Sequence, residues 1–559
     1  MTSPTLHADL LVLGGGLGGV AACLTAARLG RSVILVERSE WLGGQLTTQG
    51  VPPDEHSWIE TDLASRSYRE LRDAIRDHYR RRYPLREQYR EVEALNPGLG
   101  NVSRLCHEPR VGALVLEELL SPYLASGLVT VLRSHTLRAV ERDGRRITHV
   151  VVQGPAGIDV RLEGRLVADA TEDGEPLVLA GLPLRIGAEA RAETGELHAP
   201  ADADPLNHQA VTWCCAVEYR PGEDHTIDRP AEYDYWRTQV APFWPGPQLS
   251  WTDVVPHTLQ ERTRPLFAQS PEQAVSHWAD DLWQYRRILS REVLDGGFTG
   301  GEVTLVNWPQ VDYWDLPVVV DDPDAKERAL QGARALTLSF VYWMQTEAPR
   351  HDGGTGYPEL RLRGDVMGTA DGLAKEPYLR ESRRIVPLFT VTEAHIGRAM
   401  RGDRAGSEVF ADSVGTGYYR IDLHPSTAGR SYVDIDCFPF QIPLGALIPQ
   451  DADNLVAAAK NIGTTHITNG AYRLHPVEWS IGEAVGALAD SVVRTGETPD
   501  TIRERPELLA ALQQTLRGLG VNLAWPEEIR TGGAQFDRIR KPVEANDASP
   551  VKHLTKETR

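Results

Sequence analysis

The first forty residues contain three apolar segments separated by glycines and polar residues. The continuous apolar run Ala8–Leu13 predicts a buried strand, the small apolar residues of Leu17–Leu29 predict a helix, and Val33–Val36 predicts a second strand. Glycines separate the first strand from the helix, and an acid, Glu37, directly follows the second strand. This order predicts a βαβ unit with two parallel strands.

The glycines at the first turn have the spacing G-x-G-x-x-G, with Gly14, Gly16 and Gly19 in the three glycine positions. In a strand-to-helix turn, the first glycine allows a sharp bend, the second leaves room for a pyrophosphate, and the third allows close helix packing. The first helical turn, with Leu17 and Gly18, then offers backbone amides to the phosphates. The motif predicts a dinucleotide site.

Glu37 lies 18 residues beyond the last glycine, where a carboxylate accepts hydrogen bonds from a ribose diol. An acid at this place disfavours a 2′-phosphate, so NADP is the least favoured occupant. A second glycine-rich stretch, GGFTGG at 296–301, does not follow an apolar strand and is predicted to be a loop.

Later segments have weaker patterns. Residues 57–83 predict an exposed helix with a solvated charged face, and residues 111–124 predict a helix, followed over 129–153 by three strands with an Asp-Gly turn. Nine of the 13 tryptophans lie between Trp213 and Trp343, which indicates a second core. Trp308 and Trp314 are candidates to line a cleft.

A glycine pair, Gly43–Gly44, follows the ribose acid, and the segments 101–112, 166–181, 378–397, 440–449 and 454–489 extend the pattern along the chain. With these features the chain resembles bacterial FAD-dependent oxidoreductases of the glutathione-reductase structural class. Two positions depart from the family pattern: Glu172 replaces the glycine of A-T-G-D-G, and residues 454–460 also lack the family's glycine.

The resemblance implies an α/β fold with a discontinuous Rossmann-like FAD-binding domain, a parallel sheet and an inserted α+β substrate or cap domain. Residues 1–189 are expected to form the first part of the FAD-binding domain, with a helical insert at 57–124. Residues 190–439 would form the substrate or cap domain, 440–500 the return segment, 501–537 a C-terminal helical segment, and 538–559 a polar tail.

FAD is the cofactor that the resemblance implies. Its adenine is expected near the backbone of Thr136 and Leu137, and a helix predicted to open at Gly482 would point its first amides at the flavin. The residues expected to hold the cofactor are Gly14, Gly16, Leu17, Gly18, Gly19, Glu37, Arg38, Gly43, Gly44, Gln45, Leu46, Thr136, Leu137, Ala170, Thr171, Asn461, Gly482, Ala484 and Val485.

Catalytic candidates lie upstream of that helix. A proton acceptor near neutral pH is most naturally a histidine, so His475 is the first candidate base, with His466 behind it. Arg473 would orient a carboxylate or a developing oxyanion. The alternative is structural: His475 caps a turn before Pro476, and Arg473 pairs with Glu478.

A second candidate group is Arg380, Arg383 and Arg384, which would share one face of a helix and clamp an anionic substrate. The alternative is a solvated or ion-paired helix.

The composition limits the classes of molecule that the protein is expected to bind. The chain has 59 basic and 78 acidic residues, a net charge of −19, and no basic stripe, which argues against nucleic acid or an anionic membrane surface. No transmembrane segment is expected. The five cysteines lack metal-ligand spacing, so no metal site is expected and a reducing cytoplasm is the simplest compartment. Of the vicinal Cys214 and Cys215, one is predicted to be buried in a strand.

The sequence favours an FAD-dependent dehydrogenase or oxidase that takes hydride from a small-molecule substrate to flavin N5. No second glycine fingerprint follows a strand, which favours electrons from an organic substrate rather than from a nicotinamide cofactor. The alternatives are a flavin-dependent monooxygenase or hydroxylase and a non-catalytic FAD-binding protein. Substrate, electron acceptor, covalent attachment of the flavin and oligomeric state are open.

Overall fold

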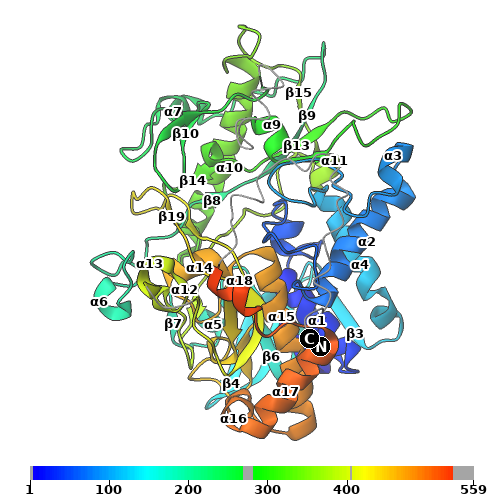
Figure 1. Cartoon of the computed structure of the whole chain (residues 1–559), viewed down its shortest axis with the longest axis vertical. Coiled ribbons are helices and arrows are strands. Elements are labelled where there is room, and N and C mark those ends of the chain that lie inside the picture. The colour runs from blue at the N-terminus through cyan, green and yellow to red at the C-terminus, as the bar shows by residue number, and fades with distance from the viewer. Residues whose placement is uncertain (1–3, 269–280, 403–405, 533–559) are drawn as a thin grey trace, which may run out of the picture.

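A seven-stranded sheet near the two ends of the chain organises the lower half of the molecule (Figure 1). The computed structural model describes residues 4–268, 281–402 and 406–532, and the predicted polar tail at 538–559 lies outside these ranges. In Figure 1 the blue, cyan and orange segments meet around this sheet, and the green middle of the chain lies above them.

The core of the sheet is parallel. Strand β1 (Thr5–Leu13) lies between β2 (Val33–Glu37) and β6 (Asp159–Asp169), with β3 (Val129–Arg133) beside β2 and β21 (Leu455–Ala457) beside β6. Antiparallel β5 (Arg146–Gln153) and β4 (Thr136–Asp143) complete the order β3-β2-β1-β6-β5-β4. The predicted α/β fold with a parallel sheet is confirmed. The carboxyl ends of β1, β2, β6 and β21 meet at one edge.

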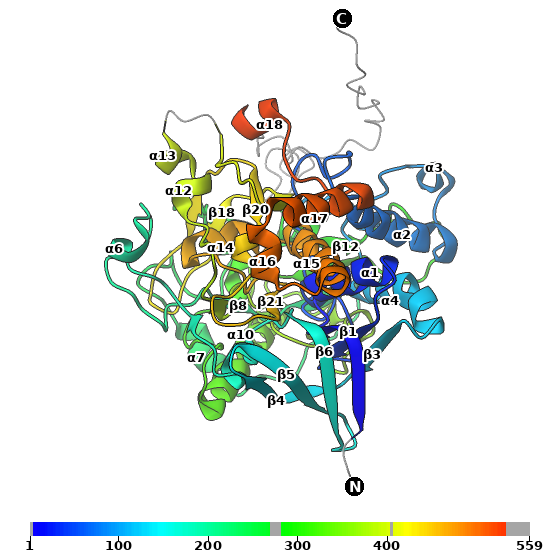
Figure 2. The same ribbon diagram turned by 90° about the horizontal axis from the view of Figure 1, so that it is seen from below.

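Helix α1 (Leu17–Arg28) follows β1, as predicted, and packs on α15 (His475–Thr495), which belongs to the far end of the chain. A Cβ at Gly482 would lie 2.1 Å from the carbonyl oxygen of Gly18, and one at Gly486 would lie 2.5 Å from that of Ala22. Glycines therefore let the two helix backbones touch. Figure 2 shows α15 among the sheet, α1 and α17 (Pro506–Leu519).

The predicted start of helix α15 at Gly482 is wrong. The helix begins two turns earlier, at His475, and Pro476 occupies its first turn, where a missing N–H and a fixed φ are compatible with a helix start. Gly482, Ala484 and Val485 are interior helical residues, so their amides bond within the helix and do not point at a ligand.

Glu483 on α15 is a buried acid that makes folding depend on pH. Its Oε1 accepts a hydrogen bond from Ser67 Oγ at 2.5 Å, and burial raises its pKa to about 7. Because the folded pKa exceeds the ordinary value near 4.5, this group adds stability below pH 4.5 that is lost as the pH rises through 7. Between pH 5 and pH 8 the wild type should lose roughly 2 kcal/mol more stability than Glu483→Gln.

Urea unfolding of both proteins at the two pH values measures this difference. Glu504→Gln, on an exposed position of α16 (Pro499–Glu504), is the control and should keep the wild-type pH dependence. Equal pH dependence of the wild type and Glu483→Gln would contradict the assignment.

The helical insert between β2 and β3 contains α2 (Arg66–Arg82), α3 (Glu87–Arg90) and α4 (Pro109–Ala125). The predicted solvated face of the first helix is wrong in part, because Arg72 and Arg76 are buried and pair with Glu60. Although burial opposes it, the two guanidinium groups lower the pKa of Glu60 to about 2. The face is buried although it is charged, because the arginines and the carboxylates of Glu55 and Glu60 compensate one another.

The apolar core continues from the lower sheet into the upper part of the molecule. Helix α10 (Pro323–Thr346) lies near a four-stranded antiparallel sheet of β12 (Arg287–Leu289), β13 (Val303–Val306), β9 (Cys215–Tyr219) and β15 (Leu360–Leu362). Of the nine tryptophans predicted to form a second core, Trp278 lies outside the described residues and the other eight are buried. Six of these eight, Trp308 among them, belong to the main apolar core rather than to a second one, and Trp244 and Trp314 lie in a small separate cluster. Trp308 and Trp314 do not line the cavity at the candidate active site, which corrects the prediction for them.

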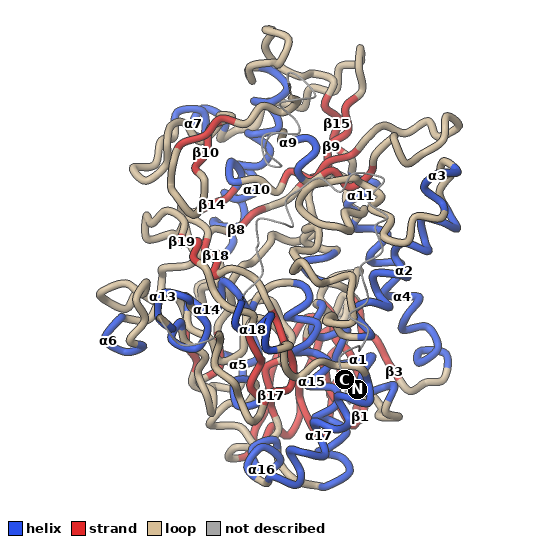
Figure 3. Tube along the Cα trace, viewed as in Figure 1, coloured by secondary structure: helices blue, strands red, loops and turns tan. Residues whose placement is uncertain are grey.

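Cys214 and Cys215 are both buried free thiols, whereas one was predicted to be buried. Alternation does not apply to the pair, because Cys214 lies in the bend between β8 (Val211–Thr212) and β9. The stretch at 296–301 is a loop, as predicted. Figure 3 shows that loops join most of the short strands in this upper part.

The remaining elements are short. They are η1 (Gly44–Leu46), α5 (Glu175–Leu179), β7 (Leu184–Arg185), α6 (Arg191–Thr194), α7 (Tyr233–Thr238), β10 (Thr252–Val254), β11 (Glu261–Thr263), α9 (Leu282–Tyr285), η2 (Pro309–Val311), β14 (Asp312–Tyr313), α11 (Gly364–Met367), β16 (Arg384–Ile385), α12 (Glu393–Ile396), α13 (Arg398–Arg401), β17 (Ser413–Gly417), β18 (Ile421–Leu423), β19 (Val433–Ile435), β20 (Phe440–Pro443), η3 (Leu444–Ala446), α14 (His466–Tyr472) and α18 (Glu527–Gly532). Within the described ranges, no helix combines the length and the apolar character needed to cross a bilayer.

Candidate active site

The glycine turn lies at the edge of the sheet where β1, β2 and β6 end. Gly14 has φ +102°, and a Cβ there would lie 2.2 Å from the carbonyl oxygen of Ala170. Cβ atoms at Gly18 and Gly19 would lie 1.9 and 2.0 Å from backbone oxygens. Close approach of backbone to backbone therefore requires these three glycines.

Gly16 is different, because a Cβ there would meet mainly side chains. The closest atoms are Glu172 Oε1 at 2.9 Å and Glu478 Oε1 at 3.4 Å. Gly16 is also the N-cap of α1, and no side chain caps the helix there. The first turn of α1 therefore begins at a small space bounded by movable side chains, as a phosphate-binding turn requires.

Glu37 is fixed at the end of β2 by backbone amides. Its Oε2 accepts from Gly15 N–H at 2.6 Å and its Oε1 from Ser39 N–H at 2.7 Å. Burial raises the pKa of this carboxyl, and the nearby Glu376 adds to the effect. Arg38 turns away to pair with Glu376. A carboxyl held in this way is suited to a ribose diol.

The backbone beside Glu37 is that of Ser134 and His135, which precede the Thr136 and Leu137 predicted to lie near the adenine. Ser134 N–H donates to Ser39 O at 3.2 Å and His135 N–H donates to Glu37 O at 3.0 Å. Thr136 already begins β4 and is exposed, and Leu137 is buried in the core. The chain turns at Ser134, which has φ +55°. The backbone therefore moves away from Glu37 before it reaches Thr136.

A buried charged cluster lies beside Gly16. Lys460 pairs with Glu172 and donates to Leu379 O at 2.9 Å, and Gln45 Nε2 donates to Glu478. Burial raises the pKa of Glu478, while Lys460 and the Gly18 N–H lower it. Gln45 Oε1, Glu172 Oε1 and Glu478 Oε1 are buried without a hydrogen-bond partner among the described residues. The cluster thus presents unused acceptor oxygens to the space beside the turn.

These features fit an adenine dinucleotide that carries hydroxyl donors. The glycine turn leaves room for a pyrophosphate, Glu37 offers a fixed acceptor for a ribose, and the unused oxygens would accept from hydroxyls such as those of a ribityl chain. Most of the predicted cofactor residues lie together here: Gly14, Gly16, Leu17, Gly18, Gly19, Glu37, Arg38, Gly43, Gly44, Gln45, Leu46, Ala170, Thr171 and Asn461.

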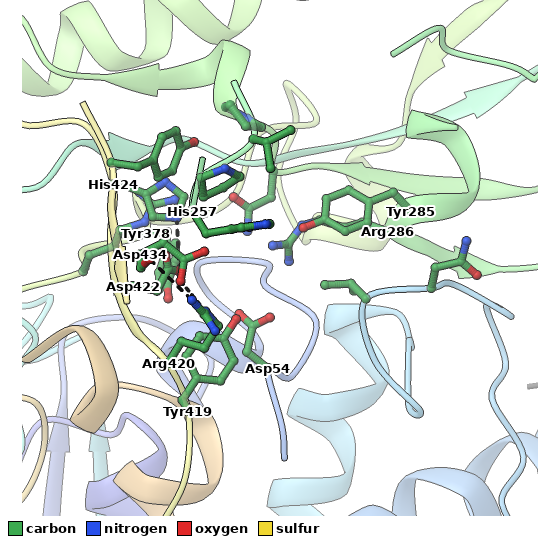
Figure 4. A pocket seen from close by; sticks show the side chains of 18 of the residues that line it. Asp54, His257, Tyr285, Arg286, Tyr378, Tyr419, Arg420, Asp422, His424 and Asp434 are labelled. Atoms are coloured by element: carbon green, nitrogen blue, oxygen red, sulfur yellow. Dashed lines mark hydrogen bonds and ion pairs between the residues drawn. The ribbon is translucent and has the colours of Figure 1, made fainter. Parts of the chain in front are cut away.

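A cavity of about 130 Å³ lies at the end of the segment that follows the glycine pair Gly43–Gly44 (Figure 4). Asp54 and Glu55 line it from this segment, and Arg473 lines it from just before α15. Gln45 links the two places, because its Nε2 also donates to Arg473 O at 3.0 Å. The cavity is therefore next to the charged cluster beside the glycine turn.

The structure separates the three predicted catalytic residues. Arg473 lines the cavity, where it donates to Tyr378 Oη at 2.6 Å and pairs with Asp422 at 3.5 Å rather than with Glu478. His466 is buried with both ring nitrogens engaged, by Glu381 at 2.8 Å and by Arg430 at 2.8 Å. Its ring is therefore not available to a substrate.

His475 is completely buried at the start of α15, and its Nδ1 accepts from Asp54 N–H at 3.1 Å. Burial holds its pKa well below the ordinary value. A ring with so low a pKa is a weak proton acceptor, so the structure does not support His475 as the base. The ring instead holds the backbone at Asp54, and the predicted cap of a turn before Pro476 is wrong because His475 is the first residue of α15.

The predicted arginine clamp on a helix is wrong. Residues 378–385 are extended, so Arg380, Arg383 and Arg384 point in different directions. Each guanidinium pairs with a different carboxylate, and the partners are Asp312, Asp321 and Glu189. The three charges are used separately to hold this extended segment.

A histidine–carboxylate pair that was not predicted from the sequence lies at the cavity. His424 lines the cavity, and its Nδ1 lies 2.6 Å from Asp312 Oδ2. Asp312 is fully buried and accepts from Thr212 Oγ1 at 2.5 Å and from Arg380 at 3.1 Å. Although burial opposes it, Arg380 and His424 lower the pKa of Asp312, so this carboxylate is ionised. The pair spans 112 residues, and no local pattern signals it.

A family model described as FAD dependent oxidoreductase matches residues 9–516. Glutathione reductase of Yarrowia lipolytica is 43% identical over 60 residues, which are 11% of this chain and 13% of the relative. NADH oxidase of Thermoanaerobacter brockii is 38% identical over 72 residues, which are 12% of this chain and 11% of the relative. The chain thus spans about a tenth of the length of these curated relatives.

Among solved structures, p-nitrophenol 4-monooxygenase PnpA from Pseudomonas putida DLL-E4 is 12% identical, with 96% of this chain and 92% of that chain covered and a TM-score of 0.34. The flavin-dependent brominase Bmp2 is 13% identical, with coverages of 40% and 48% and a TM-score of 0.24. The family match spans both the glycine turn and α15. The chain is an enzyme of the FAD-dependent oxidoreductase family, and its cofactor is FAD.

Proposed function

We propose that this enzyme oxidises a small organic substrate bound in the cavity, as a dehydrogenase or oxidase. The observation that carries the proposal is the Asp312–His424 pair, which faces the same cavity as Arg473. When bound, FAD supplies a two-electron acceptor that takes hydride from a substrate carbon at N5. The chain must then bind and orient the substrate and remove its proton.

His424 is our candidate for the proton acceptor. Because the ionised Asp312 can only accept, the ring proton lies on Nδ1, and Nε2 is left as the basic nitrogen. Burial and the neighbouring Arg380 lower the pKa of His424, so the ring is neutral before reaction. Asp422 Oδ2, 3.7 Å from Nε2, would stabilise the ring once it has gained the proton.

For the cofactor, we infer that Glu37 binds the ribose and that the first turn of α1 faces the pyrophosphate. Support comes from the two amides that fix Glu37 and from the uncapped start of the helix. In the domain division that we propose, residues 190–439 supply Asp312 and His424, and the FAD-binding parts supply Asp54 and Arg473. The five free cysteines support a reducing, cytoplasmic location.

His424→Ala tests the proposed base. The variant should retain FAD, because His424 lies at the cavity and not at the glycine turn, and should reduce it about 10²–10⁴-fold more slowly with substrate. Anaerobic bleaching of the flavin absorbance is measured over a panel of small alcohols, amines and acids. The panel also identifies which compounds act as reductants.

His149→Ala on β5 is the matched control and should bleach at the wild-type rate. An unchanged rate in His424→Ala would exclude this residue as the base. A wild-type flavin that no organic compound reduces, but that NADPH does reduce, would favour a monooxygenase instead.

A further inference from the structure

One arginine at the cavity has a buried charge that no carboxylate of the described residues contacts. Arg286 follows α9, is 9% exposed, and its guanidinium lies 5.0 Å from the ring centroid of Tyr285. Its Nε and Nη1 are buried and have no hydrogen-bond partner among the described residues. In Figure 4, Arg286 and Tyr285 project into the space opposite His424 and Asp422.

The other arginines that line the cavity are all paired with carboxylates. Arg262 and Arg264 pair with Asp253, Arg380 with Asp312, Arg420 with Asp434, and Arg473 with Asp422. Arg286 is thus the one lining guanidinium, within the described residues, for which no ion pair is found. A buried cation without a partner is unfavourable, and an anionic ligand would compensate it.

Asp54 is the acid whose charge acts on Arg286, yet no hydrogen bond or ion pair joins the two side chains in the described structure. Burial raises the pKa of Asp54 and the charge of Arg286 lowers it, so the two groups interact without a direct ion pair in the described structure. Both side chains line the same cavity, and the cavity has room for a small ligand.

We propose that Arg286 binds a carboxylate of the substrate, and that the substrate is therefore a small organic acid. This assignment rests on the proposed oxidation and specifies its substrate class. A planar guanidinium matches a carboxylate with two parallel hydrogen bonds, which Nη2 donates together with either Nε or Nη1, and neither Nε nor Nη1 has a partner among the described residues. The cavity volume of about 130 Å³ favours a short molecule. His424 lies across the space, where it can reach the carbon skeleton of the bound acid.

The test compares propionate with propionamide, which have nearly the same shape but differ in charge. Calorimetric titration of the FAD-loaded enzyme should show propionate binding at least tenfold more tightly than propionamide. Arg286→Met should bind propionate at least tenfold more weakly, with unchanged flavin absorbance. Arg286→Lys, which keeps the charge but loses the planar fork, should lie between them. Arg291→Met, at an exposed position nearby, should match the wild type.

Equal affinity for the two probes, or unchanged propionate affinity in Arg286→Met, would overturn the assignment. If Arg286→Met does not fold, the wild-type comparison and Arg286→Lys decide the question. Flavin reduction by an uncharged compound, without propionate binding, would refute the carboxylate site and leave the proposed oxidation standing. Propionate binding through Arg286, with no organic reductant of the flavin, would support the site and count against the oxidation.

Discussion

Gly16→Val should give a folded protein that does not retain FAD. A Cβ at this position meets side-chain oxygens of Glu172 and Glu478, which can move, whereas Cβ atoms at Gly14, Gly18 and Gly19 would collide with backbone. Valine at position 16 therefore fills the space that the pyrophosphate needs without breaking the contacts of α1 with the sheet and α15. We expect FAD affinity to fall by at least 100-fold, on the order of 3 kcal/mol.

The measurement is flavin absorbance after purification and titration of the stripped protein with FAD. Gly246→Val is the matched control, because a Cβ at Gly246 has no neighbour within 4 Å, and it should bind FAD like the wild type. Circular dichroism establishes that both variants are folded. Stoichiometric FAD in folded Gly16→Val would show that the cofactor does not lie at this turn.

Lys460→Met should be the most destabilising single change at the site. Lys460 is 1% exposed and neutralises Glu172, and its charge also acts on Glu478. Methionine has a similar length but leaves two buried carboxyls without their cation. Removing one partner of a buried ion pair typically costs about 3–5 kcal/mol, and we expect a loss of stability in this range.

Urea unfolding of the protein without FAD measures the loss, and the double variant Lys460→Met, Glu172→Gln provides its control. Because the double variant removes the unpaired charge together with the cation, it should recover roughly 2 kcal/mol or more of the loss. A cost below about 1 kcal/mol for Lys460→Met would show that the pair is not buried in solution.

The local part of the site was predictable from the sequence. The strand Thr5–Leu13, the helix Leu17–Arg28 and the strand Val33–Glu37 lie within two or three residues of the predicted bounds. Gly16 and Glu37 occupy the predicted places at the edge of the sheet. Here the interactions that set the structure join residues close in sequence, so hydrophobic period and glycine spacing describe them.

The cavity could not be predicted in the same way. His475 has a residue type suited to proton transfer, but contacts with distant segments bury it and depress its pKa. His424 had no local signal, and it becomes a candidate base through Asp312, 112 residues earlier. Arg286 differs from the other arginines that line the cavity in having no carboxylate partner among the described residues, which is a property of its surroundings.

The sequence by itself determined the βαβ unit, its glycine turn, the acid that ends the second strand and, with the later segments that share the family pattern, the FAD-binding class. Only the tertiary structure decided where α15 begins, which arginines are neutralised and which histidine faces the cavity. The physical reason is that backbone conformation follows local steric and hydrophobic preferences, whereas burial, charge pairing and pKa depend on neighbours that the fold brings from hundreds of residues away.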